Sequence, residues 1–280
     1  MKHALVFATG LLALGAVPAV AADLGRMPVK APLMAPIAYN WSGCYIGANG
    51  GGKWASTRGD VAVGATGTAL AGSPAVGVTF DRQNASTGIV GGQIGCNWQA
   101  PGSNWVFGVE GDADWQRWST SRTLLPGVPA PLVAGDVFDI RSRWQGSARG
   151  KVGYAWDRWM MYVTGGAAFT NVRVGSNFIQ FGIFPAAFAE DSKTLFGATV
   201  GGGIEYAITN NWSAGVEARY SWYGTQTFDG GTFAAFAVPA GAAVTFLNAP
   251  ATQTVRLDTF EVTGRLNYKF DWGGPVVARY

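Results

Sequence analysis

Acidic and basic residues recur at every second position in the middle of the chain. Glu110, Asp112 and Asp114 lie in one stretch, and Arg149 and Lys151 lie in a later one. Carboxylates held side by side can act as a general acid and a general base, so a catalytic pair is one interpretation. The same spacing recurs in further stretches without a unique constellation, which favours charges that pair with one another.

Other chemically reactive groups are scarce. His3 is the only histidine, whereas most enzymes of outer membranes need a histidine base beside a serine or an aspartate. The stretch GSARGKV (Gly146–Val152) is similar to a phosphate-binding loop, but it is one residue short and has Val152 where a hydroxyl residue is needed. The two cysteines lack the CxxC spacing of metal sites. We therefore expect no enzyme, no metal and no cofactor.

The composition is neither that of an ordinary soluble domain nor that of a helical membrane protein. Glycine accounts for 41 of 280 residues, and only 13% of residues are charged, against roughly 25% in soluble domains. Beyond the N-terminus, no run of about 20 apolar residues could form a spanning helix. The formal net charge is +3 and the basic residues are scattered, so we expect no nucleic-acid partner.

The N-terminus has the features of an export signal. Lys2 precedes the apolar run Ala4–Val17, and small residues follow at 19–22, so residues 1–22 are predicted to be a cleaved signal peptide. A membrane anchor is the alternative. Residues 23–40 contain Pro28, Pro32 and Pro36 and are predicted to be a Pro-rich periplasmic linker.

From residue 41 onward, apolar residues alternate with polar ones, which is typical of β-strands. The stretch FEVTGRLNYKF (Phe260–Phe270) shows this pattern most clearly. Eight predicted strands cover Trp41–Trp54, Thr87–Gln99, Trp105–Trp118, Ile140–Trp156, Trp159–Val174, Thr194–Ile208, Trp212–Thr227 and Val255–Phe270.

The connections between these strands alternate in length. Those at 100–104, 157–158 and 209–211 are short, and those near 55–86, 119–139, 175–193 and 228–254 are long. An outer-membrane barrel has short periplasmic turns and long extracellular loops, whereas a soluble sandwich has no reason for this alternation. Lipid offers no partner to an open sheet edge, so the sheet must close. We predict an all-β fold, an eight-stranded antiparallel transmembrane β-barrel over residues 41–270, followed by a tail at 271–280.

Tryptophan placement supports a membrane barrel over a soluble one. The chain has 12 tryptophans, and most lie near the ends of the predicted strands instead of mid-strand, where a soluble core would need them. Rings at both ends of the spans are typical of two interfacial girdles. The candidates are Trp41, Trp98, Trp105, Trp156, Trp159 and Trp212 toward the short turns, and Trp54, Trp115, Trp118 and Trp222 toward the long loops.

In such a barrel the charged side chains of each strand point into the lumen. A lumen enclosed by eight strands is just wide enough for side chains to fill it. Because the signs are mixed, we predict a salt-bridged plug, and a thin water-filled path lined by charges is the alternative. The candidate lumen network consists of Glu110, Asp112, Asp114, Arg143, Arg149, Lys151, Glu205, Glu217, Arg219, Glu261, Arg265 and Lys269.

The two cysteines lie on the outward face of neighbouring predicted strands. Cys44 is near the start of the first strand and Cys96 near the end of the second, so both lie at the periplasmic side. The periplasm permits disulfides, and we favour a Cys44–Cys96 bond over two buried thiols.

Several stretches resemble a known family. WSGCYIGANGG, GGQIGCNWQ, FGVEGDADW, GSARGKVGYAWDRWMMYVTGGAAF and the closing GRLNYKF resemble the outer-membrane immunogenic proteins of alphaproteobacteria, a RopB-type family with an OmpA-like eight-stranded membrane barrel. The resemblance covers about Trp41 to Phe270. It implies an abundant surface protein in the cell outer membrane. The last predicted strand resembles the signal that the barrel-assembly machinery reads, with Phe270 as the candidate signal residue.

Three functions remain open at this point. The first is an outer-membrane protein that supports the envelope and interacts through its surface, with a charged network filling the interior. The second is a narrow porin-like channel for small solutes. The third, a soluble barrel that carries a ligand, would need a polar exterior. The expected partners are outer-membrane lipid and lipopolysaccharide, the assembly machinery, and surface ligands of a host or the environment.

Overall fold

A computed structural model describes residues 39–63, 76–127, 134–179, 187–237 and 245–270 of the chain. The predicted signal peptide, all of the linker except its last two residues, and the tail after Phe270 lie outside the described residues. In the described part, no helix is long and apolar enough to cross a membrane.

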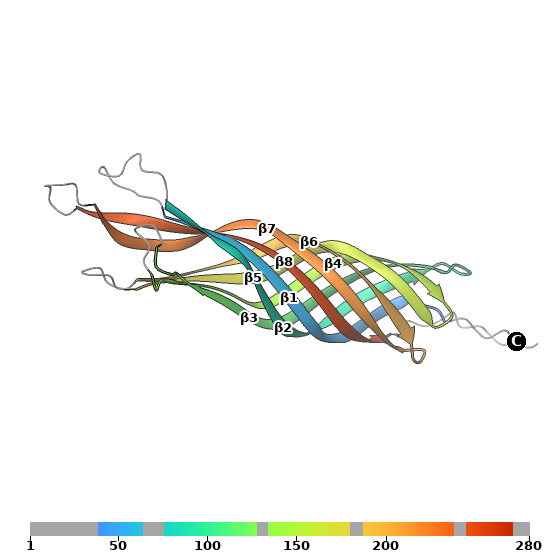
Figure 1. The fold of residues 1–280 in the computed structure, drawn as a ribbon. Helices are drawn as coiled ribbons and strands as arrows, with labels where there is room; N and C mark the ends of the chain where they lie inside the picture. Colours follow the sequence, from blue (N-terminus) through green and yellow to red (C-terminus); the bar gives the residue numbers. More distant parts are fainter. Residues whose placement is uncertain (1–38, 64–75, 128–133, 180–186, 238–244, 271–280) are drawn as a thin grey trace, which may run out of the picture. The chain divides into compact units, whose positions relative to one another are not determined.

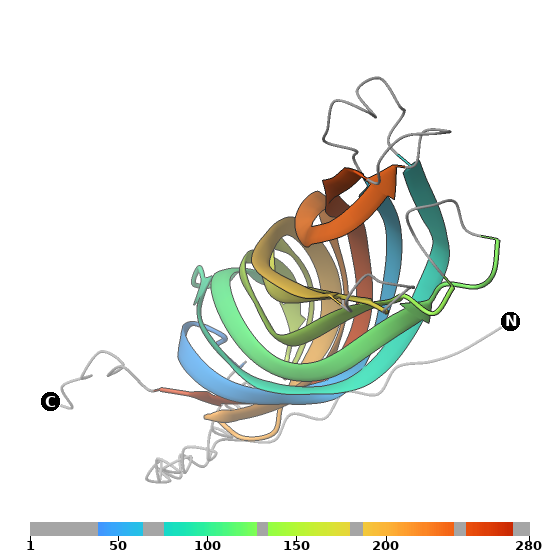
Figure 2. The ribbon, with the colours of Figure 1, turned by 90° about the vertical axis from the view of Figure 1, so that its left-hand side faces the viewer.

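Eight antiparallel strands form a closed barrel in chain order, with β8 pairing back onto β1. Figure 2 shows the strands following one another around the ring. This confirms the predicted eight-stranded all-β barrel. The strands are β1 (Gly43–Val63), β2 (Val76–Gln99), β3 (Trp105–Thr123), β4 (Val137–Trp156), β5 (Trp159–Phe178), β6 (Ala187–Ala207), β7 (Trp212–Ala237) and β8 (Thr245–Lys269).

At one end of the barrel, short turns join β2 to β3, β4 to β5 and β6 to β7. The β4–β5 turn contains only Asp157 and Arg158, and Asp157 has a φ of 51°. Aspartate tolerates this left-handed conformation better than most residues, which suits a two-residue hairpin turn. The short connections are therefore set by local turn chemistry.

At the other end, the strands extend well beyond their predicted limits. β7 continues from the predicted end at Thr227 to Ala237, and β8 begins at Thr245, ten residues before the predicted start at Val255. Backbone pairing continues along this hairpin up to Ala237↔Thr245. Much of the sequence predicted as long loops is therefore paired strand, because strand pairing satisfies backbone polar groups beyond the lipid as well as within it.

Beyond the closed barrel, the strands continue as two separate sheets. Pairing between β2 and β3 stops at Ile89↔Gln116, and pairing between β6 and β7 stops at Ala198↔Trp222. The order β7–β8–β1–β2 forms one extension and β3–β4–β5–β6 forms the other, which Figure 1 shows as two groups of strands at the left-hand end.

Side-chain contacts bridge the gap between these two sheets. The backbone N–H of Asp229 on β7 donates to the Asp191 carboxylate on β6 at 2.9 Å. This hydrogen bond stabilises the ionised form and lowers the pKa of Asp191. Thr120 Oγ1 on β3 donates to Gln83 Oε1 on β2 at 2.5 Å.

The barrel is apolar outside and polar inside. Val109 and Ile94 are 65% and 67% exposed, whereas Glu110 and Gln93, their neighbours in sequence, are buried. This inversion of the usual soluble pattern is what a lipid-facing surface requires.

Glycine permits close strand approach at some positions and not at others. A Cβ atom on Gly166 would lie 2.1 Å from the carbonyl oxygen of Ala148 on β4, whereas one on Gly150 would have no neighbour nearer than 3.9 Å. We expect Gly166→Ala to lower the free energy of unfolding by about 1–3 kcal/mol, because the two strands must move apart. Gly150→Ala is the matched control and should change it by less than about 0.5 kcal/mol. Urea unfolding in lipid vesicles, followed by tryptophan fluorescence, measures both, and equal midpoints would contradict the steric argument.

Candidate functional site

The centre of the barrel holds one continuous network of buried ion pairs. Within the described residues it joins five cations to five carboxylates: Lys53, Arg149, Lys151, Arg219 and Arg265, with Glu110, Asp112, Asp114, Glu217 and Glu261. The formal charges cancel, which is the condition for keeping ions in a dry interior.

Glu110 on β3 is the most connected carboxylate of this network. It accepts from Arg149 at 2.5 Å, from Lys151 at 3.0 Å and from Arg265. The Tyr45 hydroxyl on β1 donates to the same carboxylate. Glu110 therefore ties strands β1, β3, β4 and β8 together across the lumen.

Arg219 on β7 forms a second centre on the side nearer the strand extensions. It pairs with Asp112 at 2.6 Å, with Asp114 at 3.3 Å and with Glu261. Lys53 Nζ lies 3.9 Å from Glu261 and also donates to the side chain of Gln145. Sequence reasoning missed Lys53, although its position next to the outward-facing Trp54 assigns it to the inner face.

Three of the predicted lumen residues lie outside this network. Arg143 is exposed, because a bulge on β4 between Ser142 and Gln145 reverses the inward and outward alternation. Lys269 lies at the short-turn rim, where its ammonium group donates to the Asn40 carbonyl at 2.5 Å. Glu205 is buried but accepts hydrogen bonds from Ser213 and from Asn267, the latter at 2.9 Å, with no ion pair among the described residues.

Apolar side chains close the lumen on both sides of the ionic layer. Trp41 is only 2% exposed and packs with Val106, Met160 and Tyr162 at the short-turn end. Trp118 is 4% exposed and belongs to a larger apolar cluster toward the strand extensions. Both were predicted as girdle residues. Trp118 instead shares the inward parity of Asp112 and Asp114, and Trp41 precedes β1 and covers the mouth of the barrel.

Little free space remains within the ionic layer. The cavity between Asp112, Arg149, Glu217 and their neighbours has a volume of about 10 Å³, which is roughly the space of one water molecule. A second cavity, of about 30 Å³, lies toward the strand extensions and is lined by Thr57, Phe138 and Val255 among others. The described interior is therefore packed with side chains.

The other predicted girdle tryptophans are exposed on the outer surface. They are Trp54, Trp98, Trp105, Trp115, Trp156, Trp159, Trp212 and Trp222. Trp144, which was not among the girdle candidates, is also exposed and pairs directly with Trp115 across β3 and β4. Tyr and Phe rings complete both levels, as in the contacts of Trp54 with Phe260 and of Trp212 with Tyr268.

The two tryptophan environments can be distinguished by quenching. With brominated acyl chains in the bilayer, we expect Trp54→Phe to lower the fraction of fluorescence that the lipid quenches, because Trp54 faces the lipid. Trp118→Phe is the matched control and should leave the quenched amplitude unchanged. Equal losses for both variants would contradict the buried placement of Trp118.

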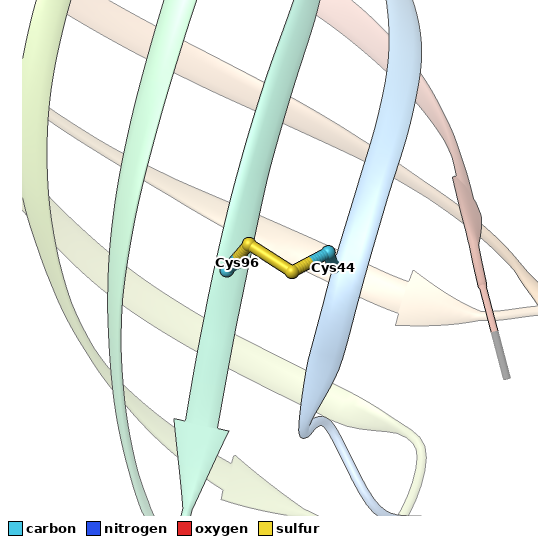
Figure 3. The surroundings of a disulfide bond; sticks show 2 residues. All are labelled: Cys44 and Cys96. Carbon is cyan, nitrogen blue, oxygen red and sulfur yellow. A yellow bond between two sulfur atoms is a disulfide. The ribbon is translucent and has the colours of Figure 1, made fainter. Parts of the chain in front are cut away.

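The two cysteines are bonded on the outer surface near the short-turn end. Cys44 on β1 lies directly opposite Cys96 on β2, and their Sγ atoms form a disulfide (Figure 3). The bond joins residues separated by 52 positions in the sequence. Nearby, the backbone N–H of Phe270 donates to the Cys44 carbonyl at 2.9 Å, so the end of β8 is anchored beside the same site.

Each carboxylate of the central network lies beside an arginine or a lysine. In the part of the chain that the structure describes, no group of three or more His, Cys, Asp or Glu side chains could hold a metal ion.

Comparison with known proteins gives consistent matches. The sequence model of the family described as outer membrane protein beta-barrel domain matches residues 9–246. The 31 kDa outer-membrane immunogenic protein of Brucella melitensis is 32% identical, over 79% of this chain and 88% of that protein. The 25 kDa outer-membrane immunogenic protein of Brucella abortus is 26% identical, over 96% of this chain and 99% of its own length. Among solved structures, the outer membrane protein OprG from Pseudomonas aeruginosa covers 83% of this chain at 12% identity, with a TM-score of 0.45.

Proposed function

Because the chain belongs to the family of outer membrane protein beta-barrel domains, we propose that it acts as a sealed barrel that stabilises the outer membrane and presents its long extracellular strands to the surroundings. The observation that carries this proposal is the filled interior. A charge-balanced ionic layer lies between two apolar layers, one around Trp41 and one around Trp118.

A sealed interior is mechanically useful in a thin barrel. Ion pairs such as Arg265–Glu110 and Arg219–Asp112 connect strands on opposite sides of the lumen, so they resist flattening of the barrel. A solute path would have to break several of these buried pairs at once, and each lost partner leaves a buried charge. This supports a scaffold over a channel.

The same features argue against an enzyme. The sequence has no histidine beyond His3, and each carboxylate of the central network has a cation beside it.

We infer that the charged residues stabilise the barrel and that the extracellular strands make the surface contacts. Leu125 and Phe188, which are exposed near the ends of these strands, are candidates for such contacts. Phe270, which is exposed at the end of β8, is the candidate for recognition by the barrel-assembly machinery.

Single-channel recording in a planar bilayer tests the sealed interior. Insertion of the refolded chain is established separately by the shift of its gel mobility on heating. We expect the native protein to be silent. A combined Trp41→Ala, Trp118→Ala, Glu110→Ala and Arg149→Ala variant should produce discrete openings, because it removes a large side chain from each apolar layer and two residues that take part in five ion pairs of the ionic layer.

The matched control is Arg173→Ala with Glu190→Ala, which removes an exposed ion pair of the extracellular extension. This variant should stay silent. Steady openings of the native protein would overturn the proposal and establish the alternative, a narrow porin-like channel for small solutes.

A further inference from the structure

Five neighbouring strands each carry an exposed arginine just beyond the extracellular aromatic girdle. We call this set the arginine belt, and it consists of Arg256 on β8, Arg58 on β1, Arg82 on β2, Arg117 on β3 and Arg143 on β4. All five side chains are exposed. The five strands are consecutive around the barrel, in the order β8–β1–β2–β3–β4, and Arg82 and Arg117 lie on either side of the gap where β2 and β3 no longer pair.

β-Bulges occur at three of these positions. The pairing shifts that insert an extra residue on β2, β3 and β4 fall at the segments that contain Arg82, Arg117 and Arg143. Bulges re-aim side chains at the rims of barrels. On β4 the bulge turns Arg143 outward against the alternation of the strand, whereas Arg82 and Arg117 share the outward parity of Val90 and Trp115.

The belt lies next to the lipid-facing rings. Arg58 is four residues beyond Trp54 and Arg256 is four residues beyond Phe260, on strands that pair directly. Arg117 is two residues beyond Trp115, and its guanidinium lies over that indole ring at 5.9 Å from the centroid. Aromatic rings mark the membrane interface, so these cations lie at the level of the lipid headgroups.

The charges of the belt are poorly compensated within the protein. Arg58 and Arg256 are direct cross-strand partners, and like charges at such positions repel. Arg58, Arg82, Arg117 and Arg143 have no ion pair among the described residues, and Arg256 has only Asp258 at 3.8 Å. Among the exposed cations outside the belt, Arg141 pairs with Asp139 at 2.6 Å and Arg173 with Glu190 at 3.3 Å, whereas Arg122 has no ion pair among the described residues.

We propose that the arginine belt binds the phosphate groups of the phosphorylated glycolipid of the outer leaflet, lipopolysaccharide. This inference rests on the proposed membrane role and names its lipid partner. Guanidinium groups bind phosphate oxygens with two parallel hydrogen bonds, and a phosphate between Arg58 and Arg256 removes the repulsion at the strand pair that closes the barrel. The adjacent apolar face holds the acyl chains, which a soluble phosphate lacks.

Binding of purified lipopolysaccharide to the refolded full chain in a neutral detergent tests this proposal, with native mass spectrometry as the readout. The test variant is Arg58→Gln with Arg117→Gln and Arg143→Gln, and we expect it to bind about 100-fold more weakly than the native chain. The matched control is Arg122→Gln with Arg173→Gln and Lys193→Gln, which removes the same charge outside the belt. We expect the control to change binding by less than about threefold.

The ligand is tested separately on the native chain. Chemically dephosphorylated lipopolysaccharide should bind to the native chain as weakly as unmodified lipopolysaccharide binds to the test variant. A 10-fold excess of inorganic phosphate should not compete with lipopolysaccharide for the native chain.

Three results would overturn the proposal: equal losses for the two triple variants, undiminished binding of dephosphorylated lipid, or full competition by inorganic phosphate. The thermal unfolding temperature of each variant without lipid shows whether the barrel is intact, and the conservative variant Arg58→Lys with Arg117→Lys and Arg143→Lys should recover part of the binding. If the arginine belt does not bind lipopolysaccharide, the native protein still conducts no current in planar bilayers. If the sealed-barrel proposal is wrong, the native protein conducts current. The two failures are therefore distinguishable.

Discussion

Replacing Glu110 by glutamine is expected to lower the free energy of unfolding by about 3–5 kcal/mol. The substitution keeps the shape of the side chain and removes its charge. Arg149, Lys151 and Arg265 then lose the carboxylate that all three share in the buried centre of the barrel. Urea unfolding of the protein in lipid vesicles, followed by tryptophan fluorescence, measures the change.

Glu190→Gln is the matched control for this prediction. Glu190 pairs with Arg173 at 3.3 Å, and both side chains are exposed. Exposed pairs contribute about 0–1 kcal/mol, because water screens them and the side chains lose entropy when they pair. If the two variants unfold at the same urea concentration, the central network does not stabilise the barrel in the way described.

A second substitution separates charge balance from local packing. Lys151→Met in the Glu110→Gln background restores the equal number of cations and carboxylates in the network. Because Lys151 lies 3.0 Å from Glu110, the two changes should couple, and the double variant should recover about 1–3 kcal/mol of the loss. Additive losses would instead indicate that the cost comes from packing alone.

The part of the fold inside the lipid could be predicted from the sequence because lipid constrains it strongly. Each spanning residue must face either acyl chains or the lumen, so parity along the strand assigned Glu110, Arg149 and Arg265 correctly to the interior. Tyr45 and Lys53 share the inward parity of β1, but glycine between them conceals the alternation. The sequence therefore predicted the charged network except for Lys53, and it did not identify Tyr45, whose hydroxyl donates to Glu110.

The features that the sequence did not predict lie where the lipid no longer fixes which side chains face outward. The bulge on β4 reverses parity at Arg143, and no residue type marks a bulge in advance. Tryptophan is favoured at interfaces and also in apolar cores, so composition alone could not place Trp41 and Trp118 inside. Beyond the membrane, Ala- and Gly-rich segments carry no lipid-imposed pattern, and their continuation as strands depends on pairing with a neighbour.

The disulfide is expected to have the other large effect. Reduction of the Cys44–Cys96 bond should lower the free energy of unfolding by about 4 kcal/mol in the chain-entropy model, since the bond closes a loop of 52 residues. The measurement compares urea midpoints of the oxidised and reduced protein in the same vesicles. A Cys44→Ser and Cys96→Ser variant is the control, because its midpoint should match that of the reduced protein and should not respond to reductant.

The location of the bond indicates which rate should change. In the unfolded chain the bond keeps the start of β1 beside the end of β2, in the register of the native pair Cys44↔Cys96. β1 is also the strand that β8 must find to close the barrel. A preformed β1–β2 pair presents one aligned edge to β8, so reduction should slow refolding into lipid more than it accelerates unfolding. Refolding kinetics followed by the heat-dependent gel shift test this, and an equal refolding rate with faster unfolding would show that the bond acts only after the barrel has closed.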